Sequence, residues 1–281
     1  MSEFVPVPGW VVKLVRAVNL YDFIYEQSAT YIKDHVKYQI TPQRKGSDEW
    51  EILTWLDADP PDPTFGVWAG ELVHNVRSAL DQLVFALVSE NGHDPGAHTQ
   101  FPIYDSETLW IRDIEQRDPV RNPSPIRGVT DEGFAFIKAT QPYHLKHKKR
   151  PAHPLMQLLL MSNVDKHRTL HAAAVRAGTP TLVAYEPPGY VTIVKKSFAN
   201  QRTVVRSGEE IGRVQRRVTA VPPPGTKMQM RIQGIAELVF MQEGRPPIAG
   251  VNDLGLIIQA ARDIVQGLYP WQPPVPLPEG W

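Results

Sequence analysis

The chain has 281 residues, of which 42% are hydrophobic and 21% charged, so it can bury a real core and does not have the composition of a disordered chain. Lys and Arg together number 30, as do Asp and Glu, and this zero net charge does not favour a dedicated nucleic-acid binder. The absence of cysteine excludes disulfides, zinc–thiolate sites, iron–sulfur ligation and cysteine nucleophiles.

The N-terminus shows no basic region followed by an apolar one, which is the pattern of a secretory signal. No apolar run reaches the ~18 residues that a membrane-spanning helix needs. We therefore expect a cytoplasmic protein without membrane contact.

The first third of the chain predicts two helices and a hairpin. Residues 11–35 repeat apolar side chains at helical spacing and predict an amphipathic helix. Residues 36–56 form two alternating runs around a polar turn, which is typical of a β-hairpin. After a proline-rich break at 57–63, Thr64 can cap a helix over about 64–90.

The middle of the chain predicts further helices. Ser106 and Thr130 can each cap a short one. A basic, histidine-rich connector occupies 144–153. Pro154 suits the first turn of a helix over about 154–176, which Gly178 would close.

Beyond residue 178 the apolar side chains alternate with a period of two, as in strands. Strands are predicted at 181–186, 190–196, 202–207, 211–218 and 227–241. Asn252 can cap a closing helix over 253–268, and the proline-rich tail at 270–281 is predicted to be extended.

The predicted fold class is α+β, because the helical and strand-like segments are segregated along the chain. We expect a helical bundle with a small β-hairpin insertion, followed by a mostly antiparallel sheet and a closing helix. The expected regions are a helical domain at 1–178 with its hairpin at 36–56, a β region at 179–250, the closing helix at 251–269 and the tail at 270–281.

A first polar cluster lies on the helix predicted at 64–90. His74, Arg77 and Asp81 share the arc opposite the apolar one, next to Asn75, and Arg77 can pair with Asp81 at i,i+4. Three interpretations are open: a solvated face, a buried network that links helices, and a ligand-binding or catalytic site.

A second cluster lies at 163–171. On an unbroken helix Asp165 falls on the apolar face, where it needs a partner such as Arg77 or His74. Alternatively, Asp165 caps a new helix after a break at Ser162-Asn163.

His167 and His171 are spaced at i,i+4, which suits two metal ligands on one helix. The intervening residues lack the glutamate of an HExxH motif, and Arg168 disfavours a nearby cation. We therefore expect no metal at this cluster.

The two clusters also carry a resemblance. The motifs GELVHNVRSALD at 70–81 and NVDKHR at 163–168 together resemble a group of uncharacterised bacterial and phage proteins, over about residues 70–171. The same region is similar to HEPN helical bundles, several of which are metal-independent ribonucleases or nucleotide-binding modules. The resemblance implies that the chain shares the helical arrangement of these bundles and is a relative of the HEPN ribonucleases.

The HEPN catalytic pattern is an Arg followed, little more than one helical turn later, by a His. This sequence departs from it, because Asp81, Gln82 and Leu83 occupy those places after Arg77. After Arg168, His171 follows only three residues on.

We expect both clusters to converge on one polar pocket between two long helices. The candidate catalytic residues are His74, Arg77, Asp81, Asp165, His167 and His171. The candidate ligand-binding residues are Asn75, Lys166, Arg168, Lys148, Lys149 and Arg150. If the site is catalytic, a His would be general acid or base and Arg77 would stabilise developing charge.

The expected ligand is anionic, a nucleotide or an RNA phosphate, with no cofactor, and a homodimer is a further possibility. In the rival interpretation the protein is not an enzyme: the clusters only lock the helices together, and partners bind through the sheet or the proline-rich tail.

Overall fold

The computed structural model describes residues 7–44, 49–118, 123–167, 170–186, 190–198, 209–218, 220–221, 225 and 229–269. The chain divides into two compact units. Unit 1 comprises Met1–Tyr25, Gly66–Leu170 and Asn252–Trp281, and unit 2 comprises Glu26–Phe65 and His171–Val251.

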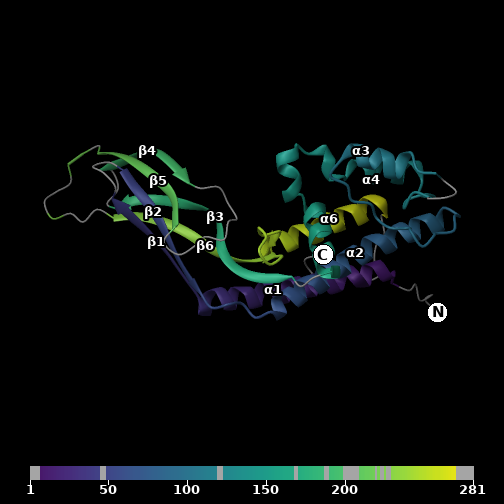
Figure 1. Cartoon of the computed structure of the whole chain (residues 1–281), viewed down its shortest axis with the longest axis horizontal. Helices are drawn as coiled ribbons and strands as arrows, with labels where there is room; N and C mark the ends of the chain where they lie inside the picture. The colour runs from purple at the N-terminus through teal and green to yellow at the C-terminus, as the bar shows by residue number, and fades with distance from the viewer. Residues whose placement is uncertain are drawn as a thin grey trace, which may run out of the picture. The chain divides into compact units, whose positions relative to one another are not determined.

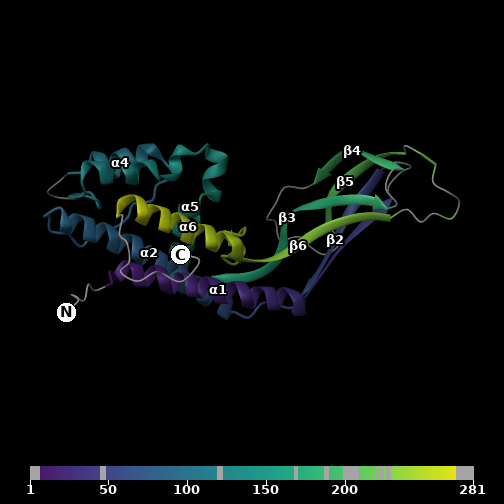
Figure 2. The ribbon, with the colours of Figure 1, turned by 180° about the vertical axis from the view of Figure 1, so that it is seen from behind.

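Three long helices, α1 (Gly9–His35), α2 (Thr64–Glu90) and α6 (Val251–Leu268), contribute to the core of unit 1, which contains α1 up to Tyr25, α2 from Gly66 and α6 from Asn252. Figures 1 and 2 show α6 running alongside α1 and α2 in both views. The helices approach closely where Gly255 of α6 meets the Tyr21 ring of α1, since an added Cβ would lie 3.0 Å from that ring. Their apolar arcs meet in a core in which Ala17, Leu72 and Leu254 are fully buried.

Shorter helices complete unit 1. They are α3 (Glu107–Trp110), η1 (Ile111–Glu115), α4 (Asp131–Ala139), η2 (Pro142–His144), η3 (His147–Ala152) and α5 (Pro154–His167). Thr130 caps α4 as predicted, because its hydroxyl accepts the Gly133 N–H. Trp110 is fully buried, and its Nε1 donates to Glu115, which also pairs with Lys138.

The described residues of unit 2 form two antiparallel sheets. The first has the order β1 (Val36–Arg44), β2 (Glu49–Ala58), β5 (Glu209–Val218), β4 (Val191–Phe198). The second has the order β3 (His171–Glu186), β6 (Gln229–Met241), β7 (Ala249–Gly250). The predicted hairpin is therefore not isolated, because β2 pairs with β5 as well as with β1.

The α+β class is confirmed: helices dominate, antiparallel strands follow, and a helix closes the described chain. The hairpin strands belong with the later strands in unit 2, whereas the closing helix belongs with the early helices in unit 1. The strand predicted at 202–207 and the tail predicted at 270–281 lie outside the described residues.

One predicted helix is wrong in its second half. The helix starting at Pro154 ends at His167, and residues from His171 onward form β3. His171-Ala172-Ala173-Ala174 has no strong strand signal of its own, but its backbone pairs in register with Met241-Phe240-Val239-Leu238 of β6. Tertiary pairing has therefore overridden the local helical preference.

Among the described helices, none combines the length and the apolar character required to cross a membrane.

Candidate functional site

Helix α2 presents an apolar arc inward and a polar arc outward, as its 3.6-residue period requires. Leu72, Val76 and Leu83 are fully buried, whereas His74 is exposed and Arg77 and Asp81 are intermediate. The side chains of Arg77 and Asp81 retain 13% and 31% of their accessible surface. Both therefore lie at the edge of the core, where an ion pair is screened less than at the open surface.

Arg77 and Asp81 together bind both backbone polar groups of Phe101, its carbonyl and its N–H. Arg77 Nη2 donates to the Phe101 carbonyl oxygen at 2.6 Å and lies 3.1 Å from Asp81 Oδ1. The Phe101 N–H in turn donates to Asp81 Oδ1 at 2.9 Å. One i,i+4 pair thus satisfies a donor and an acceptor that would otherwise be unpaired beside the fully buried Phe101 ring.

Gln141 does the same for the next residues of that segment. Its buried amide nitrogen donates to the carbonyl oxygens of Pro102 and Ile137, each at 3.0 Å. Its amide oxygen accepts the Tyr104 N–H at 2.9 Å. The Gln141 amide thereby makes the hydrogen bonds to this backbone that a neighbouring strand would make in a sheet.

We expect Gln141→Ala to lower the free energy of unfolding by about 2 kcal/mol, because it leaves the Pro102 carbonyl and the Tyr104 N–H unsatisfied in a buried place. The Ile137 carbonyl keeps its hydrogen bond from the Thr140 hydroxyl. Gln116→Ala, at an exposed position, is the matched control and should change little. Urea denaturation measures both. Equal stability of the two variants would show that solvent replaces the Gln141 contacts.

The end of α5 brings part of the second cluster to α2. His153 opens this helix by accepting the Leu155 N–H at Nδ1, and burial lowers the pKa of His153, which keeps that nitrogen free to accept. At the other end, Lys166 approaches Asp81 of α2. Burial raises the pKa of Asp81 overall, against the opposing effects of the Arg77 charge, the hydrogen bond from the Phe101 N–H and the Lys166 charge.

Asp81 and Lys166 border an open pocket of about 300 Å³, called here the α2–α5 pocket. It is lined by His74, Arg77, Ser78, Asp81, Gln82, Phe85, Thr99 and Lys166. The two cations Arg77 and Lys166 exceed the single carboxylate by one charge. Arg77 Nη1 is also buried and has no hydrogen-bond partner among the described residues, which is rare in folded proteins.

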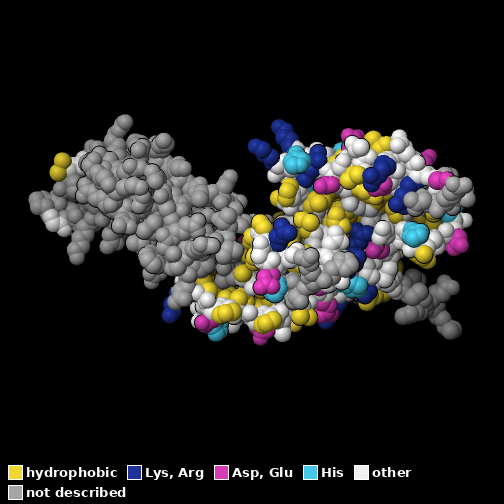
Figure 3. Space-filling view, in the orientation of Figure 1, with side chains coloured by type: hydrophobic (Ala, Val, Ile, Leu, Met, Phe, Trp, Pro, Cys, Tyr) yellow, Lys and Arg dark blue, Asp and Glu magenta, His cyan; other side chains and the backbone are white. Residues whose placement is uncertain are grey.

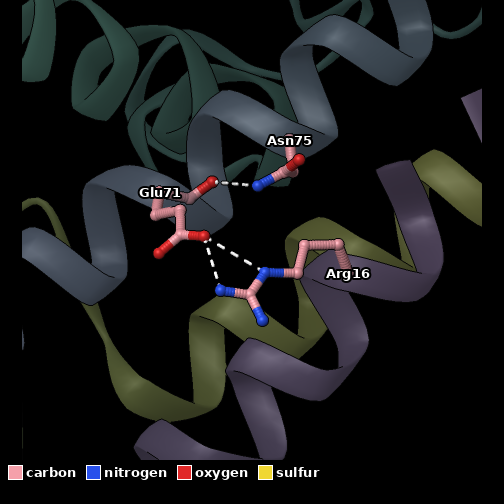
Figure 4. A network of polar contacts seen from close by, with 3 residues as sticks. All are labelled: Arg16, Glu71 and Asn75. Atoms are coloured by element: carbon pink, nitrogen blue, oxygen red, sulfur yellow. Dashed lines mark hydrogen bonds and ion pairs between the residues drawn. The ribbon is translucent and has the colours of Figure 1, made fainter. Parts of the chain in front are cut away.

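Asn75, a predicted ligand residue, is buried and is not among the pocket's lining residues. Figure 4 shows its amide donating to the Glu71 carbonyl oxygen at 2.8 Å, one turn earlier in α2. The Glu71 carboxylate extends to Arg16 of α1, whose Nη2 lies 2.7 Å away. This network joins α1 to α2.

Asp165 does not occupy the predicted place. It is exposed, near the end of an unbroken α5, so neither the inward-facing carboxylate nor the cap of a new helix is correct. It lies against Gly70, where an added Cβ would come within 2.8 Å of its Cγ. Gly70 precedes Arg77 by seven residues, or roughly 10 Å of helix, and Arg77 is paired with Asp81 instead.

The predicted histidine pair is also separated. His167 is the last residue of α5, whereas His171 begins β3 in unit 2, so the two do not share a helix. Arg168 lies outside the described residues. In the part of the chain that the structure describes, no three His, Asp or Glu side chains are grouped so that they could hold a metal ion.

The basic connector has a mixed role. Lys148 and Lys149 are exposed on η3, but Arg150 is a structural residue. Its guanidinium donates to the carbonyl oxygens of Leu145, Asp105 and Tyr143, so it is not free to grip a phosphate. Tyr143 is buried, which raises its pKa to about 12 and makes it a core residue.

Ser78, Gln82, Phe85 and Thr99 line the pocket without having been predicted. The first three lie on the same face of α2 as the polar cluster, so helical spacing alone could have identified them. Thr99 comes from a loop, and no sequence pattern could have placed it there.

Comparison of the chain with known protein families, with curated proteins and with solved structures gives no significant match. The resemblance to HEPN bundles therefore stays a prediction, and function is inferred from the pocket itself.

Proposed function

We propose that unit 1 binds a small phosphate-bearing ligand in the α2–α5 pocket. The supporting observation is the composition of its wall: Arg77 and Lys166 outnumber the one carboxylate, and two hydroxyls and an amide are at hand. Phosphate oxygens accept hydrogen bonds from all of these groups, and charge-assisted bonds are the stronger kind.

The roles of the two cations differ. Arg77 is already bound to Asp81 and Phe101, so its guanidinium is preorganised and contributes a fixed positive field. Lys166 is exposed and extends from the end of α5, so its ammonium can close on an arriving anion. His74 adds a further positive charge when it is protonated.

The test compares Lys166→Gln with wild type for binding of inorganic phosphate by calorimetry at pH 8. We expect about tenfold weaker binding. A hydrogen bond to a charged group contributes roughly 1.5–3 kcal/mol, and the lower value applies because Lys166 is exposed to solvent. Raising the salt concentration should weaken wild-type binding more than that of the variant, through screening of Lys166.

The matched control is the double substitution Lys148→Gln and Lys149→Gln on the exposed connector, which should leave binding unchanged. If this control loses as much affinity as Lys166→Gln, the anion binds at the connector. If phosphate binds none of the proteins, the proposed function is wrong.

A second candidate function is purely structural, and one observation favours it: Arg77 and Asp81 are both used to hold Phe101. In that case the polar arc of α2 locks the 101–104 segment and needs no ligand. The phosphate titration separates the two functions, because a structural lock gives no binding heat.

A further inference from the structure

A second hollow adjoins the α2–α5 pocket. It has a volume of about 320 Å³ and is formed by two loops of unit 1, residues 93–99 and 123–128. Its polar wall includes His93, Asp94, His98, Ser124 and Arg127. We call it the loop hollow.

Hydrogen bonds fix both loops. The Gln100 N–H donates to the Pro125 carbonyl oxygen at 3.1 Å and ties one loop to the other. Asn91 at the end of α2 donates to the Gly128 carbonyl oxygen at 2.9 Å. Gly128 has a φ of 92°, and an added Cβ would lie 2.9 Å from the Cβ of His93, so only glycine lets that ring pack so closely. The hollow is thus preformed.

Thr99 lines both cavities, so the two are neighbours in unit 1. Each cavity alone lies at the lower end of the range of roughly 300–1,000 Å³ that is usual for ligand sites, and together they fall well within it. Each also has a buried polar atom without a hydrogen-bond partner among the described residues, Arg77 Nη1 beside one and Ser124 Oγ beside the other.

The two walls differ in chemistry. The α2–α5 pocket supplies cations. The loop hollow has one guanidinium, Arg127, whose charge the Asp94 carboxylate balances, and it adds two imidazole rings and two hydroxyls. This wall has no net charge, and it suits the flat rings and hydrogen-bonding edges of an organic group better than a second phosphate.

We propose that the two cavities are one site for a phosphate monoester of nucleotide size, with the phosphate between Arg77 and Lys166 and the sugar and base in the loop hollow. This inference rests on the proposed function. It adds the organic half of the ligand and assigns His93, Asp94 and His98 to it.

A single small ligand fits the surface better than a long RNA strand. On the face drawn in Figure 3, basic and acidic side chains are interspersed over most of unit 1. A strand of RNA needs a continuous cationic track, because its affinity comes mainly from successive phosphate contacts. RNA binding is therefore the competing outcome in the test.

The experiment is a calorimetric titration of the full chain at pH 8, where unperturbed histidines are neutral. The probes are the four common nucleoside 5′-monophosphates, inorganic phosphate and adenosine. At least one nucleoside monophosphate should bind ten or more times tighter than inorganic phosphate, and adenosine should bind weakly.

Single substitutions distinguish the phosphate-binding part of the site from the part that binds the sugar and base. We expect His98→Ala to weaken nucleotide binding about fivefold or more and to leave the affinity for inorganic phosphate unchanged. Lys166→Gln should weaken both. His98 is exposed, so its truncation should not disturb the fold, and thermal unfolding checks this. His147→Ala, an exposed histidine outside both cavities, is the control and should change neither affinity.

If phosphate binds but no nucleotide binds more tightly, or if His98→Ala weakens both ligands equally, this inference fails and the proposed function stands. If neither phosphate nor any nucleotide binds, both fail. If a ten-nucleotide RNA binds far more tightly than every monophosphate, the ligand is a strand and the one-site inference is overturned.

Discussion

Replacement of Asp81 by Ala should lower the free energy of unfolding by about 3 kcal/mol. The substitution leaves the Arg77 guanidinium, 13% exposed, without its carboxylate, and it removes the acceptor of the Phe101 N–H. Removing one partner of a buried ion pair costs about 3–5 kcal/mol, and the partial exposure of Asp81 places this pair at the lower end. Chemical denaturation followed by tryptophan fluorescence measures the loss.

Two further variants separate charge from hydrogen bonding. Asp81→Asn keeps an acceptor for Phe101 and should lose about half as much stability as Asp81→Ala. Glu71→Ala breaks the Arg16–Glu71 pair, which has the shorter distance of 2.7 Å but side chains 54% and 41% exposed, and should cost less than about 1 kcal/mol. Burial, not distance, sets the order of these effects.

Hydrogen exchange gives an independent measurement of the same contact. The Phe101 amide should exchange much faster in Asp81→Ala than in wild type, while amides in the middle of α2 change less. A variant that loses less than ~1 kcal/mol and keeps slow exchange at Phe101 would show that Asp81 does not hold this segment.

The sequence was sufficient to predict α2, because its apolar side chains repeat over many turns and the buried residues lie where the period places them. The Arg77–Asp81 pair follows from i,i+4 spacing alone. The partner that gives the pair its role is the Phe101 backbone, twenty residues after Asp81. Any residue type supplies a backbone N–H and carbonyl, so this contact leaves no mark in the sequence.

The second cluster was harder to predict, because its position depends on where α5 ends. Alanine-rich residues after His171 are compatible with a helix, and only pairing with β6 makes them a strand. That pairing places His171 in β3 and not in the helix that contains His167. Among the described residues of the second cluster, Lys166 alone lines the pocket. The loop residues Thr99 and His98 carry no periodic signal at all.

Gly66→Ala is expected to be the most damaging single methyl addition in unit 1, with a loss of about 3 kcal/mol or more. The new Cβ would overlap the Leu170 carbonyl oxygen and lie 2.9 Å from the Leu170 carbonyl carbon. These are backbone atoms, which cannot rotate away, so the helix or the 170 backbone must shift. The gain of up to ~1 kcal/mol in helix propensity does not offset this cost.

Gly70→Ala, one turn further along α2, is the matched control. There the new Cβ meets the carboxylate of Asp165, an exposed side chain that can turn into solvent, so the cost should stay below about 1 kcal/mol. In the double variant Gly70→Ala with Asp165→Ala the obstruction is gone, and the propensity gain should raise stability to or above that of wild type. Thermal and urea unfolding compare the stability of the three variants with that of wild type. Wild-type stability in Gly66→Ala would mean that the backbone of Leu170 does not pack against α2.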